Sequence, residues 1–372
     1  MSEWNKTYYF PREMLEQPSA IENCLSALSE TIDNIVKRAK SVSQVHIVGS
    51  GDCYFISITA AESFLKMAGI VAAGYEAYDY YLNKPSVDNN TLVILFSSSG
   101  KSVYVLKAAE YANQCGAFTV GVTNHADSEL ETICKCSLVT IAVGVSKSFP
   151  SKTSTSALAL MYCMAARLGK IKGFLSDEKS AAFNEELTSS VPALIRRIYE
   201  TEHQKIIQSA KQFLEARCYI FVGSGPSRTS AMIGAAKITE TSRLHVTSCN
   251  AEEYMHLHGF SVKCPDAVII IGNNLFSHRE RQVLEYAVQQ CAKVLVIGNV
   301  DCSGYKNNVV HIADFIENLS AFSVVLPSMV ALHLFACELA HLSYKDPDMP
   351  HDVDLKHVIG QLYKGPVAGW QK

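Results

Sequence analysis

A cluster of serines with one glycine follows an apolar segment near residue 97. Val93 to Phe96 are all apolar, as in a strand buried on both faces of a parallel sheet. The hydroxyls that follow belong to Ser97, Ser98, Ser99 and Ser102. Gly100 permits a tight turn, and a helical pattern begins at Val103. The N-terminus of such a helix offers N–H groups and partial positive charge to a phosphate. These residues predict either an anion cradle or an ordinary serine cap of a helix.

Two glycine pairs stand at similar turns. Gly49-Ser50-Gly51 and Gly223-Ser224-Gly225 each follow an apolar segment and precede a helical one. Tyr54 and Arg228 occupy the place of the third glycine of a dinucleotide fingerprint, so a nicotinamide or flavin role has weak support. The lysine of a P-loop is missing from both turns, which excludes a nucleotide triphosphatase. We expect no cofactor.

The elements that position these turns alternate between strand and helix. Apolar segments near residues 45–48, 70–77, 93–96, 118–122 and 137–143 alternate with helical patterns. This order predicts an α/β fold with a doubly wound parallel sheet. Before it, residues 1–17 have the composition of an arm without a long regular element, and residues 21–39 predict an amphipathic helix.

The same order of landmarks recurs in the second half of the chain. Gly223 lies 174 residues after Gly49, Asn273 lies 176 after Ser97, and Asn299 lies 175 after Asn124. A nearly constant offset predicts a duplicated domain. We therefore expect an N-terminal arm and helix (1–40), a first domain (41–180), a second domain (190–345) and a C-terminal tail that closes over the site (346–372). The charged and small residues 170–190 would hold the linker.

Two GxG-opened halves with an S-x-S-G-x-S turn in the first resemble the double-SIS (sugar isomerase) family. That family includes the isomerase half of glucosamine-6-phosphate synthase and the fructosamine-6-phosphate deglycases. The resemblance implies two tandem flavodoxin-like domains in αβα sandwiches. It also implies that Ser97, Ser98, Ser99 and Ser102 bind a sugar phosphate, and that Gly51, Asp52, Cys53, Ser151 and Lys152 line the same site. Lys101 stands where the family often has an acidic residue, and either aids phosphate binding or is solvated.

The resemblance places the catalytic groups in the second half. Lys237 and Glu240 match the family's K-x-x-E pair, whose glutamate moves a proton between C1 and C2. Their spacing puts them on one helical face, where the ammonium would keep the carboxylate ionised; the residues alone also suit a surface ion pair. The family's ring-opening histidine matches His256 by its distance from Glu240 and Glu253, whereas His258 matches the following glycine. A tail lysine that reaches the substrate matches Lys356, or Lys356 is a solvated residue.

The resemblance therefore implies an aldose–ketose isomerase or a deglycase that acts on an amine-substituted hexose 6-phosphate. No glutaminase domain precedes residue 1, so we expect no supply of ammonia from this chain, which favours the deglycase or amino-sugar catabolism. It also implies a homodimer, because the family takes the histidine from the partner subunit. The alternative is a SIS protein that binds a sugar phosphate without turnover, which the altered histidine loop would explain.

The composition of the chain argues against several other classes of protein. The chain has 372 residues, 48% of them hydrophobic and 19% charged, with a formal net charge of -3. Such a balance gives no support to binding of nucleic acid or a membrane surface. We find no apolar run near the ~20 residues of a spanning helix and no signal peptide, so we expect a cytoplasmic protein. The 12 cysteines form no CxxC pair, and we expect reduced thiols and no metal site.

Overall fold

The computed structural model describes residues 7–140, 142, 149–275, 278–313, 316 and 318–349. Among them, each half of the chain contributes one parallel five-stranded sheet. The first sheet consists of β1 (Gln44–Gly49), β2 (Val71–Glu76), β3 (Thr91–Phe96), β4 (Phe118–Thr123) and β5 (Cys136–Val139). The second consists of β6 (Tyr219–Gly223), β7 (Val246–Cys249), β8 (Ala267–Ile271), β9 (Lys293–Ile297) and β10 (Val309–Ile312).

The two sheets have the same topology. The strand order is β2-β1-β3-β4-β5 in the first sheet and β7-β6-β8-β9-β10 in the second, which is the flavodoxin-like order in both. Each strand of the second sheet therefore takes the place of its counterpart in the first. The predicted α/β fold with two doubly wound sheets is confirmed, and the equal strand orders agree with a duplication.

Helices cover both faces of each sheet. In the first half these are α5 (Asp52–Ala68), α6 (Ala77–Asn83), α7 (Val103–Gln114), α8 (Glu129–Ile133) and α9 (Lys152–Ile171). In the second half they are α13 (Ser227–Ser242), α14 (Ala251–His256), α15 (His278–Gln289) and α16 (Val325–Leu342). Alternate residues of β3 serve the two faces: Ile94 joins the core between the halves, and Val93 packs under α7.

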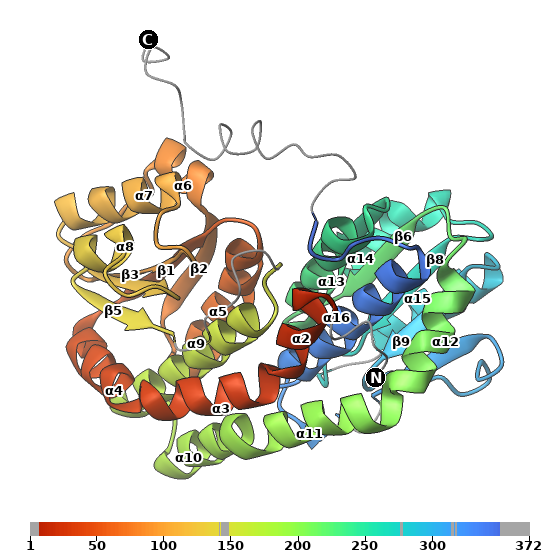
Figure 1. Cartoon of the computed structure of the whole chain (residues 1–372). Coiled ribbons are helices and arrows are strands. Elements are labelled where there is room, and N and C mark those ends of the chain that lie inside the picture. Colours follow the sequence, from red (N-terminus) through yellow and green to blue (C-terminus); the bar gives the residue numbers. More distant parts are fainter. Residues whose placement is uncertain are drawn as a thin grey trace.

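The halves meet through a layer of four helices. α5 and α9 pack together on the first sheet, α13 and α16 pack together on the second, and α5 contacts α13 between the sheets (Figure 1). The largest hydrophobic core runs through this layer and contains residues of both halves, such as Phe64 and Phe335. The carboxyl ends of β1 and β3 and the helix α13 are therefore fixed relative to one another by a continuous core.

The N-terminal segment and the connection between the halves are helical. α2 (Tyr9–Leu15), α3 (Gln17–Ala27) and α4 (Ser29–Arg38) precede the first sheet. The predicted arm thus contains a helix, whose Phe10 and Met14 are buried, and the predicted helix 21–39 is two helices that meet at Leu28. The connection contains α10 (Asp177–Glu185), α11 (Val191–Arg197) and α12 (His203–Phe213), with π-helical turns at Glu186–Ser190 and Ile198–Glu202. It runs along one side of both halves (Figure 1).

One helix, α16, is strongly apolar and largely buried. Among the described residues, α16 alone is long and apolar enough to cross a membrane, and 83% of its 18-residue window is buried inside the protein. It packs against α12 and α13, and Leu332 and Phe335 belong to the core between the halves. An apolar helix with most of its surface buried is typical of the core of a large domain.

Candidate functional site

A pocket opens at the carboxyl ends of β1 and β3. In a doubly wound sheet the strand order reverses at this position, and the turns after the two strands leave a crevice. The pocket has a volume of about 260 Å³. Its lining contains Ser50, Asp52, Cys53, Phe96, Ser97, Ser98, Ser99, Ser102, Pro150 and Glu240. All but Glu240 come from the first half, so one residue of α13 completes the pocket from the other half.

The serine turn presents an open helix end to this pocket. Ser102 occupies the N-cap position of α7, yet its side chain does not cap the helix. Instead its hydroxyl lies 2.8 Å from the hydroxyl of Ser97, and its N–H donates to the Ser97 Oγ at 3.3 Å. The first-turn N–H groups of α7 thus have no acceptor in the N-cap side chain, which usually supplies one.

Gly100 holds the shape of this turn. Its φ is 68°, a left-handed conformation that favours glycine. A Cβ at this position would lie 2.3 Å from Ser128 Oγ, so no side chain fits. The Gly100 N–H donates to the Ser97 carbonyl at 2.9 Å, which closes the turn. Both the conformation and the space therefore require glycine here.

The first glycine turn brings a carboxylate and a thiol to the pocket. Gly51, with φ 58°, precedes α5, and Asp52 and Cys53 are the first two residues of that helix. A Cβ on Gly49 would meet the backbone of Cys53 at 2.7 Å, so the strand and the helix approach closely. Burial, together with the nearby Asp52 charge, raises the pKa of the Cys53 thiol to about 11, so the thiol is protonated near neutral pH.

Three charged side chains meet where α5 and α13 cross. The ammonium of Lys237, which has no exposed surface, lies 2.7 Å from Asp52 Oδ2 and 2.6 Å from Glu240 Oε2. Ser154, near the start of α9, donates to Asp52 Oδ2 at 3.1 Å. The Lys237–Glu240 contact is the expected i,i+3 pair, but the two residues do not form a surface ion pair. They are joined to a carboxylate of the other half.

Burial and charge act in opposite directions on this cluster. Burial alone lowers the pKa of Lys237, but the carboxylates of Asp52 and Glu240 outweigh it, and the net pKa is raised. Burial raises the pKa of Glu240 to about 7; Lys237 opposes that rise and Asp52 adds to it. Burial is the largest of these influences on Glu240, and the ammonium that opposes it is shared by two carboxylates. A carboxyl group with a pKa near neutrality can both accept and donate a proton.

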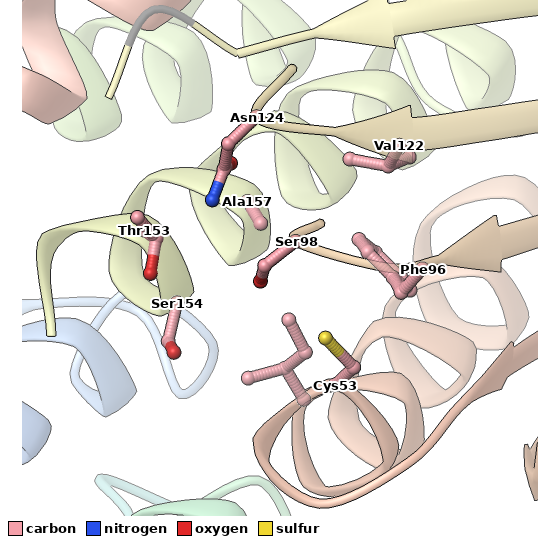
Figure 2. A pocket seen from close by; sticks show the side chains of 9 residues that line it. Cys53, Phe96, Ser98, Val122, Asn124, Thr153, Ser154 and Ala157 are labelled. Atoms are coloured by element: carbon pink, nitrogen blue, oxygen red, sulfur yellow. The ribbon is translucent and has the colours of Figure 1, made fainter. Parts of the chain in front are cut away.

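A smaller cavity lies directly behind the pocket. Its volume is about 10 Å³, close to the room that one water requires. Cys53, Phe96 and Ser98 line both spaces, and the cavity is completed by Ile56, Val122, Asn124, Thr153, Ser154 and Ala157. Figure 2 shows the Cys53 sulfur and the Ser98 hydroxyl facing this space. Of these two spaces, only the outer pocket has room for a ligand larger than a water molecule.

Ser151 and Lys152 stand beside the pocket without lining it. Pro150 is the nearest residue of that segment in the lining. Lys152 begins α9 and its ammonium lies 2.5 Å from Glu16 Oε2 of α2's C-terminal cap. The Ser151 hydroxyl is buried and has no hydrogen-bond partner among the described residues. Their predicted contact with substrate stays a prediction.

The two histidines and Glu253 lie apart from the pocket of their own chain. His256 ends α14, its side chain is 77% exposed, and its Nε2 lies 3.2 Å from Glu252. His258 begins the 3-10 turn His258–Ser261. Glu253 and Asn250 form a capping box at the start of α14, so the Glu253 side chain stabilises the end of that helix. Among the described residues, the pocket lining contains no histidine.

The start of the C-terminal tail is anchored to α2 and to the end of α13. The Asp348 carboxylate accepts hydrogen bonds from the N–H groups of Tyr9 and Phe10, at 2.7 and 2.8 Å, and so caps α2. Arg243, which follows α13, donates to the carbonyl of Met349 at 2.7 Å. Lys356 lies outside the described residues.

The corresponding turn of the second half is filled by its own side chains. Asn273 donates to Glu280 at 3.1 Å and accepts from the N–H of Leu275 at 2.8 Å. Asn274, with φ 55°, donates to the carbonyls of Ile316 and Leu319. These amides occupy the position at which the first half has a serine cluster. The duplicated fold therefore carries two different turns at equivalent positions.

Sequence reasoning did not single out Ser154, Phe96 or Pro150. Phe96 and Pro150 line the pocket, and Ser154 supports Asp52 from behind. Ser154 and Pro150 belong to the polar segment before α9, which was a usable signal. The contact between Asp52 and Lys237 left no trace in the local pattern, because the two residues come from separate halves.

Comparisons with known proteins identify relatives of this chain by sequence. Residues 40–167 match the family model described as SIS domain. Glutamine–fructose-6-phosphate aminotransferase [isomerizing] of Thermococcus kodakarensis is 25% identical over 354 residues, which cover 93% of this chain and 57% of that protein. The Escherichia coli protein of the same name is 24% identical over 363 residues, covering 93% and 58%. The chain thus spans little more than half the length of these relatives.

Solved structures share the fold. The C-terminal domain of glucosamine-fructose-6-phosphate aminotransferase from Francisella tularensis superimposes with a TM-score of 0.81 and 21% identity, covering 94% of this chain and 100% of that one. The tagatose-6-phosphate ketose/aldose isomerase from Escherichia coli gives 0.77 and 17%, covering 95% and 97%. The resemblance to double-SIS proteins that the motifs indicated is confirmed.

Proposed function

We propose that this chain is an enzyme that processes an amine-substituted hexose 6-phosphate, either as an aldose–ketose isomerase or as a deglycase. One observation carries the proposal: a single pocket combines the open N-terminus of α7 and its serines with the half-buried carboxyl group of Glu240. An anion site and a proton-transfer group in one small pocket suit a phosphosugar. The names of the relatives, which include isomerizing aminotransferases, support the same class.

The phosphate would bind at the serine turn. The hydroxyls of Ser97, Ser98, Ser99 and Ser102 line the pocket together with the end of α7. No lysine or arginine belongs to the described lining, so the hydroxyls, N–H groups and helix dipole would supply the recognition. Anchoring the phosphate away from the reacting carbons orients the sugar without touching the chemistry.

Glu240 would act as the proton shuttle. In the open-chain sugar its carboxylate removes the proton from the carbon, C1 or C2, that lies next to the carbonyl. The C–H electron pair forms the C1=C2 double bond and the carbonyl π pair moves onto its oxygen to give an enediolate, in which the neighbouring hydroxyl proton passes to that oxygen. The resulting carboxylic acid then returns the proton to the other carbon. A pKa of about 7 suits both steps, because the group gains and loses the proton with little cost near neutral pH. Isomerase and deglycase share this transfer and differ in whether an amine leaves.

The charge of the reactive end favours an amine on the substrate. Asp52 and Glu240 both line the pocket, whereas Lys237 between them has no exposed surface. Two carboxylates against one ammonium leave this end negative when Glu240 is ionised, which complements a protonated amine. The phosphate and amine ends of the pocket would thus be recognised by opposite electrostatics.

A panel of hexose 6-phosphates and fructosamine 6-phosphates tests the proposal. Thermal stabilisation would identify ligands, and product formation would identify substrates. We expect Glu240→Gln to reduce kcat by roughly 10²–10⁴-fold, the usual contribution of a general base, with ligand stabilisation retained. Glu62→Gln is the matched control, because Glu62 of α5 is also a glutamate whose pKa is raised by burial but does not line the pocket.

Two results would contradict the assignment. Turnover that survives Glu240→Gln would show that another group moves the proton. Ligands that stabilise the protein without any product from the whole panel would favour the alternative, a SIS protein that binds a phosphosugar without turnover. The absence of a histidine from the described pocket lining of the single chain is the observation that favours this alternative.

A further inference from the structure

Asp52 has a position that its local sequence does not explain. It is the first residue of α5, and its carboxylate is 8% exposed. Its Oδ2 forms an ion pair with the Lys237 ammonium of the other half at 2.7 Å and accepts a hydrogen bond from the Ser154 hydroxyl of α9 at 3.1 Å. A single carboxylate oxygen therefore joins three elements. A buried carboxylate that is satisfied by protein groups in this way is already occupied before substrate arrives.

We infer that Asp52 is a positioning residue: acting through Lys237, it sets the charge and the orientation of Glu240. This inference rests on the proposed role of Glu240 as the proton shuttle. The geometry supports this inference because the Lys237 ammonium contacts both carboxylates, Asp52 at 2.7 Å and Glu240 at 2.6 Å. The ion pair with Asp52 therefore weakens the stabilisation that Lys237 gives to the Glu240 carboxylate. A lysine held by two carboxylates is also fixed in space, and it fixes the Glu240 rotamer in turn.

The Asp52 charge shifts the pKa of Glu240 in one direction, upward. Burial raises the pKa of Glu240, Lys237 lowers it, and the Asp52 charge raises it again. Without the Asp52 charge, Lys237 would belong to Glu240 alone, and the pKa of Glu240 would fall. A carboxylate with a lower pKa is a weaker base, so Asp52 would maintain the basicity that the proton transfer needs.

The elements packed against α13 carry further titratable groups, which include Lys66 on α5 and Glu338 and His341 on α16. Burial raises the pKa of Cys53 on α5 to about 11 and that of Cys249 on β7 to about 12, and raises the pKa of Tyr219 on β6. Burial, with the Lys237 charge, lowers the pKa of His333 on α16. Glu62 of α5 interacts with Arg228. Among the charged groups, Lys237 and Asp52 are the ones that shift the pKa of Glu240.

The pH profile of kcat/KM tests the inference. Since the base must be unprotonated, the wild-type rate should fall below about pH 7. We expect Asp52→Asn, which keeps the side-chain shape, to move this acid limb to lower pH by about one unit and to lower kcat, while the loss of its charge raises KM for an amine substrate. A higher KM with an unmoved limb would instead mean that Asp52 acts on the substrate alone, and would overturn the inference.

A second variant covers the case in which Asp52→Asn does not fold. Ser154→Ala removes the hydroxyl that shares Asp52 Oδ2 with Lys237, so Lys237 is drawn more strongly to Asp52. We expect a smaller shift of the acid limb, toward higher pH. An unmoved limb in Ser154→Ala, or a shift to higher pH in Asp52→Asn, would overturn the inference.

A readout that does not need turnover separates this inference from the proposed function. The carboxyl carbon of Glu240 can be titrated by ¹³C NMR and assigned by its loss in Glu240→Gln. A lower titration midpoint in Asp52→Asn supports the positioning role even if the panel yields no product. An unchanged midpoint overturns the inference even if Glu240→Gln abolishes turnover and the proposed function stands.

Discussion

Lys237 is a fully buried cation that two carboxylates share. A buried charge is tolerated when it is paired and hydrogen-bonded, and here the partners come from both halves of the chain. Glu240 retains 28% exposure of its side chain on the pocket side, whereas Asp52 retains 7%. The difference suits one carboxylate that meets a ligand and one that holds the lysine.

Ser102 allows the two interpretations of the serine turn to be separated. If it serves a phosphate, Ser102→Ala should raise KM for a phosphosugar about tenfold with kcat nearly unchanged, because it removes binding that ground and transition states share. Ser176→Ala is the matched control, since Ser176 does cap a helix, accepting from the Lys179 N–H at 3.3 Å. It should cost about 1 kcal/mol of stability and leave KM unchanged.

Steady-state kinetics and thermal denaturation of both variants check this prediction. The opposite result would be that Ser102→Ala loses about as much stability as Ser176→Ala and keeps the wild-type KM. That pattern would mean that the serine cluster serves the helix and that the phosphate binds elsewhere.

At the scale of elements, the strands and the first helices of each half followed from local pattern. Val93 to Phe96 form β3 because a run of apolar residues fits a strand that is covered on both faces. The N-terminal helices were less accessible. α2 is capped by Asp348, a residue 339 positions away, and such a contact leaves no periodicity in the local sequence. The break at Leu28 between α3 and α4 was likewise not visible in the helical spacing.

The two equivalent turns predict how many anions one chain binds. The serine turn faces a pocket, whereas Asn273 and Asn274 fill their own turn by hydrogen bonds. We therefore expect one phosphosugar per chain, despite the duplicated fold. Isothermal titration calorimetry measures this number, and Ser102→Ala should weaken the single event. Two equivalent binding events per chain would contradict the assignment of separate tasks to the halves.

At the scale of the whole molecule, the candidate site exists because the halves are packed together. The sequence indicated the serine turn and the Lys237–Glu240 pair separately. The distance between them depends on how α5 packs against α13, which is a property of the common core. Local pattern therefore predicted the parts of the site, and it left open that Asp52 would bind Lys237.

The histidines lead to a prediction about assembly. His256 is exposed and neither it nor His258 lines the pocket of its own chain, while Leu257 and Phe260 beside them are 65% and 74% exposed. We expect a homodimer in which this surface reaches the pocket of the partner, as the family resemblance implies. Sedimentation should give twice the chain mass at working concentration. A monomer that turns over substrate would contradict this.

The filled turn at Asn273 and Asn274 also has a meaning in terms of descent. If the two halves descend from one unit, as the constant offset predicts, they have kept the same strand order but differ at the equivalent turns. If the first half binds the ligand and the second supplies the group that reacts with it, neither half can be lost or change its site residues without loss of activity. Natural selection then acts on this duplicated chain as on a single indivisible unit.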